Sequence, residues 1–170
     1  MPRVHATQTA RADCDNGAMS ELKARLRTDL TASIKARDEV RSSTLRMVLT
    51  AITNAEVSGK ASRELSDDDV IGVLSTEAKK RREAAEAFDD AGRTEMASKE
   101  RAESSVLADY LPAQLSESEI ADLVTSTIVQ LGVKDEGARA MGKVMGALQP
   151  QIKGRADGGV VAGEVRRQLA

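Results

Sequence analysis

The sequence predicts an all-α protein, with an N-terminal four-helix domain followed by a small three-helix C-terminal domain. Ala, Leu, Glu, Lys and Arg dominate the 170 residues, runs of β-branched residues are absent, and apolar side chains recur at helical spacing. Pro112 and the residues after it form the best linker. We therefore expect a disordered leader over residues 1–19 and domains over residues 20–112 and 113–170.

The first two helices are predicted over residues 21–37 and 38–58, with Ser20 and Asp38 as their N-caps. Almost no residues separate them, so we expect an antiparallel hairpin. One face of the first helix carries an apolar residue every fourth position: Leu22, Leu26, Leu30 and Ile34.

The third and fourth helices are predicted over residues 66–90 and 93–110. Three aspartates in the first turn of the third helix suit the positive end of its dipole. The fourth helix ends before Pro112, because the residue that precedes a proline disfavours the α region. The basic run 79–82 is interpreted as a solvated helix face, since glutamates stand at pairing distance along the same helix.

The last three helices follow the linker. The fifth covers residues 116–131, opens on a Ser-x-x-Glu capping box and stops at Gly132. The sixth is predicted over residues 138–149, before Pro150, and the last begins after the N-cap Asp157.

Composition excludes several kinds of chemistry. One His and one Cys leave no material for a zinc site or a disulfide within one chain, and a His-based triad would have to use His5 in the leader. Two aromatic residues cannot form a stacking surface for single-stranded nucleic acid. No phosphate-loop motif occurs. We expect no catalytic residue, no metal and no cofactor.

The sequence predicts a cytoplasmic protein. No apolar run is long enough to span a membrane, and the leader lacks the apolar segment of a secretory signal. Met19 precedes the first helical pattern immediately and is interpreted as an alternative translation start.

The formal charge of −2 hides an uneven distribution along the chain. Residues 21–65 carry a net +3, residues 66–133 a net −8 and residues 134–170 a net +3. A polyanion can approach the C-terminal segment if the fold keeps the acidic stretch apart from it. Plain solvation of uneven helical surfaces accounts for the same pattern equally well.

Two features of the C-terminal segment are candidate binding elements. Gly142 and Gly146 lie in a predicted helix, where each costs about 1 kcal/mol relative to alanine. Either close helix packing or a backbone kept bare for a ligand accounts for them. The turn that carries Lys153, Gly154 and Arg155 precedes a helix N-terminus, which suits a phosphate group, although an ordinary interhelical turn has the same composition.

Several of these segments resemble the GatB/YqeY family. Met141–Leu148 and Lys153–Gly158 are similar to its C-terminal signature, and Leu111–Glu117 is similar to its linker motif. The resemblance covers about residues 20–170, and the leader departs from the usual start of the family. Stand-alone YqeY-like proteins are also similar to the N-terminal half at residues 41–46, 54–56, 77–82 and 91–93.

The resemblance implies a C-terminal domain related to the tail of the B subunit of the glutamine-dependent tRNA amidotransferase, which helps hold the tRNA elbow. The family label is carbon–nitrogen ligase with glutamine as amido-N-donor, but the domains that catalyse that reaction are absent from this sequence. The candidate RNA-binding residues are Lys143, Lys153 and Arg155 from the motif and Arg166 and Arg167 from charge, and the expected close-approach glycines are Gly142, Gly146 and Gly154.

Three functions follow as hypotheses. The leading one is a non-catalytic module that binds tRNA or other structured RNA through its C-terminal domain. The second is an accessory role beside amidotransferase subunits in amide transfer to misacylated tRNA. The third is a protein-interaction adaptor that docks through the acidic stretch 66–133. The sequence specifies neither the particular RNA nor the oligomeric state.

Overall fold

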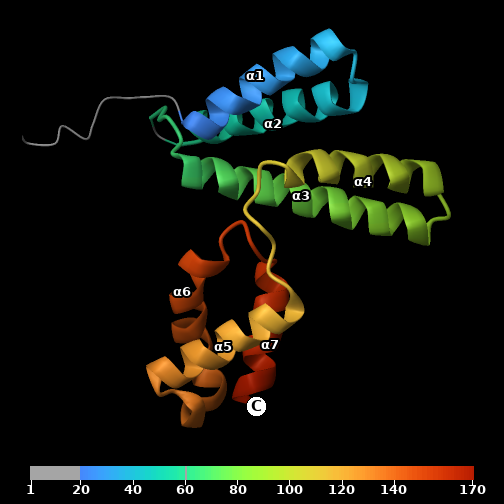
Figure 1. Cartoon of the computed structure of the whole chain (residues 1–170). Helices are drawn as coiled ribbons and strands as arrows, with labels where there is room; N and C mark the ends of the chain where they lie inside the picture. Colours follow the sequence, from blue (N-terminus) through green and yellow to red (C-terminus); the bar gives the residue numbers. More distant parts are fainter. Residues whose placement is uncertain (1–19, 60) are drawn as a thin grey trace, which may run out of the picture.

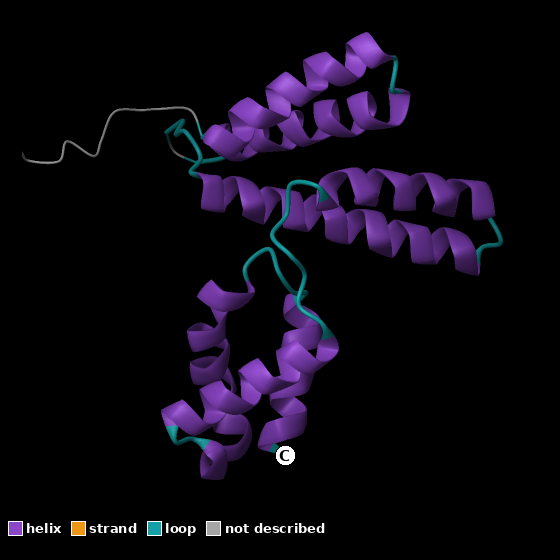
Figure 2. Ribbon diagram, in the orientation of Figure 1, coloured by secondary structure: helices purple, strands orange, loops and turns teal. Residues whose placement is uncertain are grey.

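A computed structural model describes residues 20–59 and 61–170 of the protein, and the predicted leader lies outside them. The described residues contain no strand, which confirms the predicted all-helical fold (Figures 1 and 2). None of their helices is long and apolar enough to cross a membrane. The elements are α1 (Glu21–Ala36), α2 (Glu39–Val57), α3 (Asp67–Asp90), α4 (Thr94–Ala108), α5 (Glu117–Leu131), the 3₁₀ segment η1 (Lys134–Ala140), α6 (Met141–Ile152) and α7 (Gly158–Leu169).

The four N-terminal helices form two antiparallel hairpins, α1 with α2 and α3 with α4, stacked on each other (Figure 1). Ser20 caps α1 by accepting from the Lys23 amide, and Ser66 opens α3 with a capping box. Both hairpins share one hydrophobic core. Its members are Leu26, Leu45, Val48, Ile52, Leu65, Val70, Leu74, Ala78, Leu107 and Tyr110.

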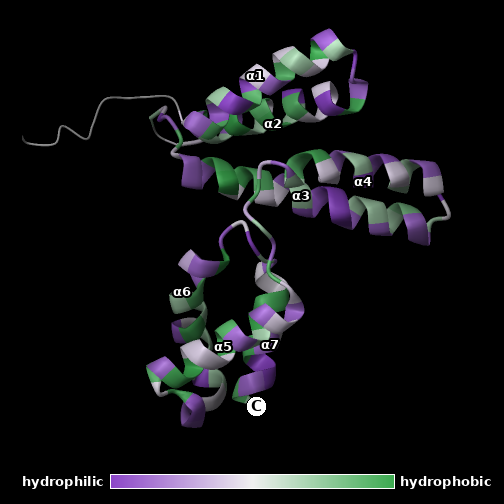
Figure 3. Cartoon of the chain, in the orientation of Figure 1, coloured by the Kyte–Doolittle hydropathy of each residue, from purple (hydrophilic) through white to green (hydrophobic). Residues whose placement is uncertain are grey.

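The three C-terminal helices enclose a second core that shares no residue with the first. Apolar residues (green in Figure 3) alternate with polar ones along these helices, as expected when one face of each is buried. The division into two independently folding domains stays a prediction. The members of this core are Ile120, Val124, Ile128, Val133, Ala140, Val144, Leu148, Ile152, Val161, Val165 and Leu169.

Three details differ from the predicted elements. Helix α6 begins at Met141, because Gly137 at φ 55° and ψ −141° interrupts the segment before it. It then continues through Pro150 to Ile152, whose side chain is buried in the C-terminal core and holds the last turn. Ile34 is 47% exposed, because the apolar stripe of α1 runs out at the tip of the hairpin.

Candidate functional site

The two groups of helices meet where the linker 111–116 passes the turn 153–157, and we call this region the junction (Figure 1). Gly154 lies at φ +73°, a conformation that side-chain-bearing residues rarely adopt. A Cβ there would collide with the side chain of Ile71 on α3 and lie 3.2 Å from Cδ of Pro112. Gly154 is therefore the residue that lets the turn approach α3 and the linker closely.

Hydrogen bonds tie the turn to the linker. The Leu115 amide donates to the Arg155 carbonyl at 2.7 Å, and Nε2 of Gln114 donates to the Gly154 carbonyl at 2.6 Å. Nε of Arg155 donates in return to the Ala113 carbonyl at 3.3 Å. Arg155 is partly buried, so part of its hydrogen-bonding capacity holds the junction together.

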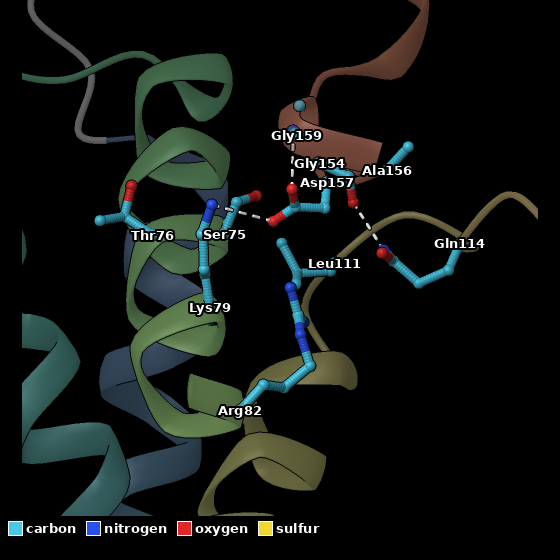
Figure 4. A pocket seen from close by; sticks show the side chains of 11 residues that line it. Ser75, Thr76, Lys79, Arg82, Leu111, Gln114, Gly154, Ala156, Asp157 and Gly159 are labelled. Carbon is cyan, nitrogen blue, oxygen red and sulfur yellow. Dashed lines mark hydrogen bonds and ion pairs between the residues drawn. The ribbon is translucent and has the colours of Figure 1, made fainter. Parts of the chain in front are cut away.

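Asp157 connects α7 to α3. Its Oδ1 accepts from the Gly159 amide at 2.7 Å and caps α7, while its Oδ2 lies 3.2 Å from Nζ of Lys79 on α3 (Figure 4). Desolvation pushes the pKa of Asp157 upward, but the Gly159 and Lys79 interactions outweigh it and hold the pKa below its ordinary value. The carboxylate is therefore charged at neutral pH and already satisfied.

A pocket of about 190 Å³ opens beside this ion pair. Lys79 points across it to Asp157, and Arg82 extends along Leu111 from the next turn of α3 (Figure 4). Ser75 and Thr76 add hydroxyl groups, and the turn adds backbone from Gly154 and Gly158–Gly159. Arg82 is exposed and has no hydrogen bond or ion pair to any described residue.

The basic run 79–82 is not the single solvated face that the sequence suggested. Lys80 pairs with Glu77 at 2.7 Å, and Arg81 turns inward to contact Glu100 and Glu103 at 3.2 and 3.4 Å. Lys79 and Arg82 lie on the other side, at the pocket. Consecutive residues of a helix point to different faces, so these four adjacent cations lie in two different environments.

The outward face of α6 combines exposed cations with bare backbone. Gly142 and Gly146 are exposed, and a Cβ at either would meet no atom of the described chain within 4 Å beyond its own helix. The expected close approach is therefore absent at these two glycines, and helix packing does not explain them. Lys143 on the same helix is exposed, with only a 3.9 Å pair to Glu136, and Lys153 at its end is exposed.

The candidate arginines of α7 lie away from the junction, because α7 starts there and ends at the opposite side of the C-terminal helices (Figure 1). Arg167 makes two hydrogen bonds to Glu164, at 2.8 and 2.6 Å, and lowers the pKa of that carboxyl to about 2. Arg166 is exposed beside a small apolar cavity that Met141 and Leu169 also line. Lys153 and Arg155 thus lie in the turn of the junction, whose pocket Lys79 and Arg82 of α3 line, and these two were not among the predicted binding residues.

The arrangement defines a class: a small helical protein with two hydrophobic cores, a tightly bonded junction between them, and no metal-binding cluster among the described residues. The chain belongs to the YqeY-like family. The model of that family, described as "Yqey-like protein", matches residues 23–169.

Two fungal relatives are similar over much of their length. "Altered inheritance of mitochondria protein 41, mitochondrial" of Pyrenophora tritici-repentis is 32% identical, covering 78% of this chain and 71% of its own. An uncharacterised protein of Schizosaccharomyces pombe is 36% identical, covering 58% of this chain and 79% of its own. The first name places that relative in mitochondria. The cytoplasmic location predicted for this chain stays a prediction.

Proposed function

We propose that the protein is a non-catalytic module that contacts structured RNA, such as tRNA, through its C-terminal helices. The observation that carries the proposal is the outward face of α6, where exposed Lys143 stands between two glycines that pack against nothing else in the described chain, with exposed Lys153 just after the helix. Glycines within a helix lower its stability, and here no helix packing compensates for that cost. A ligand that approaches the backbone closely would explain why glycine occupies these positions.

The chemistry of this face suits a phosphodiester backbone. Lysine ammonium groups contact phosphates as point charges. Because glycine has no side chain, an RNA strand can approach the helix backbone closely at Gly142 and Gly146. Double-helical RNA is recognised mainly by shape and by phosphate and 2′-hydroxyl contacts, which need no aromatic platform. The resemblance to the tRNA-holding tail of the amidotransferase B subunit supports tRNA as the first RNA to test. With few cations, we expect weak affinity and a modest salt dependence.

A titration of total tRNA at low salt tests the proposal. We expect the wild type to bind and the double variant Lys143→Ala/Lys153→Ala to lose about tenfold in affinity, with a shallower salt dependence. The matched control is Lys35→Ala/Lys99→Ala, which removes the same charge from exposed positions on α1 and α4. Arg155 is left intact because it also bonds the linker. No binding by the wild type, or equal binding by both variants, contradicts the proposal.

An accessory role beside amidotransferase subunits is a second proposal that rests on the same resemblance. Co-purification of this chain with such subunits would support it. We expect the isolated chain to show no glutaminase or amidation turnover.

The adaptor hypothesis has less support, because much of the acidic stretch is used internally. Glu77 and Glu103 are buried beside Arg81, and Asp69 pairs with Arg63 at 3.0 Å. Capture of protein partners that survives nuclease treatment would favour the adaptor over the RNA-binding module.

A further inference from the structure

The junction brings cations from both groups of helices onto one side of α3. Lys79 and Arg82 come from α3 itself, and Lys153 comes from the turn after α6. The Lys153 side chain lies across α3, with its Cε 3.9 Å from the position of a Cβ built on Gly72. Gly72, Thr76 and Lys79 share this face, since residues three and four apart are neighbours on a helix.

Some charged groups of the pocket have an ion-pair partner in the described chain and one does not. Its one carboxylate, Asp157, is held by Lys79 and by the Gly159 amide. Glu83, on the same helix, is 3.9 Å from Lys79. Arg82 remains as the cation with no partner among the described residues, and its guanidinium borders the opening. A planar guanidinium presents several donors in a fixed fork, which matches phosphate oxygens.

We propose that the junction pocket binds a backbone phosphate of the RNA, with Arg82 as the principal contact and Lys79 beside it. The inference rests on the proposed function and extends it, because the RNA-binding surface then continues from α6 across the turn onto α3. One RNA molecule contacts both groups of helices and holds them in a single orientation.

The volume of the pocket and its fixed wall support this assignment. Its volume of about 190 Å³ has room for about six water-sized groups, which is sufficient for a phosphate and part of its hydration. The hydroxyl groups of Ser75 and Thr76 and the amide of Gln114 already donate to backbone carbonyls, so Arg82 and Lys79 are the side chains left to donate to a phosphate. The closely packed Gly154 and the hydrogen bond from Gln114 hold the turn against α3 and the linker, so the wall of the pocket opposite Arg82 and Lys79 is held in place.

The test compares Arg82→Ala with Arg93→Ala in the full chain. Arg93 is exposed at the far tip of the α3–α4 hairpin, so its removal takes away the same charge far from the junction. We expect Arg82→Ala to weaken total-tRNA binding about threefold to tenfold and to reduce the magnitude of the salt slope by about 1, while Arg93→Ala changes neither. Arg82→Lys keeps the charge but loses the fork, so we expect it to fall between the wild type and Arg82→Ala.

The outcomes separate the two proposals. If the wild type binds tRNA and Arg82→Ala matches Arg93→Ala, the junction phosphate site is wrong and the proposed function stands. If the wild type binds no RNA, the proposed function fails and the junction site fails with it. Arg82 makes no intramolecular bond to a described residue, so a loss of affinity in Arg82→Ala cannot be attributed to unfolding. Circular dichroism of each variant checks this point.

Discussion

The N-terminal and C-terminal helices solve the same packing problem differently. Among the described residues, the buried polar or charged side chains are Ser20, Lys23, Ser33, Ser42, Thr44, Glu77 and Glu103 in α1–α4 and their flanks, against Thr127 alone in α5–α7. The N-terminal hairpins meet through ion pairs as well as apolar contacts. The C-terminal helices bury an almost purely apolar core and leave several cations exposed. Buried charge in the N-terminal region is used for structure, whereas the cations proposed to meet a ligand, Lys143, Lys153 and Arg82, are exposed.

The largest expected effect comes from truncating one leucine in each core. Leu45 and Leu148 are both fully buried, in the N-terminal and C-terminal cores respectively. Replacing either by alanine should cost about 4 kcal/mol of unfolding free energy, because the lost transfer energy adds to a cavity. We expect each variant to lose hydrogen-exchange protection only in its own group of helices. Equal loss throughout the chain would show that the two cores unfold as one unit.

The sequence specified the helix starts well, because a cap is a local interaction. As predicted, the N-caps Ser20, Asp38, Ser116 and Asp157 each accept from an amide two or three residues onward. Ser66 caps α3 in the same way. Gly132 ends α5 at φ 62° for an equally local reason. Local chemistry of this kind is readable without knowing what a helix packs against.

The candidate site was less predictable, because it depends on which faces meet. Periodicity showed that residues 79–82 lie on a helix, but only the packing of α4 against α3 turns Arg81 inward and leaves Arg82 at the junction. The spacing of Gly142 and Gly146 suited close packing equally well until α6 was seen to turn them outward. Contacts between residues far apart in sequence decide such cases.

The second prediction concerns the ion pair between α1 and α2. Nζ of Lys23 lies 2.5 Å from Oε1 of Glu56, and the side chains are only 8% and 12% exposed. The hydrogen bond from Lys23 holds the pKa of Glu56 below its ordinary value. Lys23→Ala should cost about 3 kcal/mol in chemical denaturation, because it leaves a nearly buried carboxylate without its partner.

The paired variant Lys23→Met/Glu56→Met is the control for that measurement. It removes both charges and keeps apolar volume, so we expect most of the lost stability to return. If the double variant were as unstable as Lys23→Ala, the ion pair itself would stabilise the fold, beyond merely neutralising the Glu56 carboxylate. That result would strengthen the contrast between the two cores.

The third prediction uses Tyr110, the single tyrosine of the chain. Its hydroxyl donates to Asp29 at 2.6 Å and accepts from Arg41 at 2.9 Å, anchoring the start of the linker to the N-terminal helices. Burial, together with the Asp29 hydrogen bond, raises the pKa of Tyr110 to about 12. Tyr110→Phe should therefore lower the unfolding free energy by about 1–2 kcal/mol at neutral pH.

The pH dependence has a definite sign. A folded-state pKa above the unfolded value of about 10 means that the stabilisation is fully present below pH 10 and is lost as the pH rises through about 12. Tyrosinate absorbance reports this residue alone and should rise near pH 12 in the folded protein. The wild type and Tyr110→Phe should both lose stability at high pH as their lysines titrate. The additional loss that comes from Tyr110 should be absent from Tyr110→Phe. Tyrosinate formation near pH 10 in the folded protein would contradict the prediction.

The smallest effect is expected at the ion pair that crosses the junction. Asp157→Asn keeps a side-chain oxygen that can cap α7 but removes the charge facing Lys79. Because Lys79 is 48% exposed, the pair should contribute less than about 1 kcal/mol, and the loss should vanish in high salt. Asp157→Ala also loses the cap and should cost about 1 kcal/mol more, independent of salt.

The low pKa of Asp157 means that the stability of the wild type should approach that of Asp157→Asn only below about pH 4. If Asp157→Asn and Asp157→Ala were equally unstable at every salt concentration, the carboxylate would act on α3 rather than on α7. The junction would then depend on charge as the N-terminal hairpins do, instead of on the backbone contacts of Gly154 and Leu115.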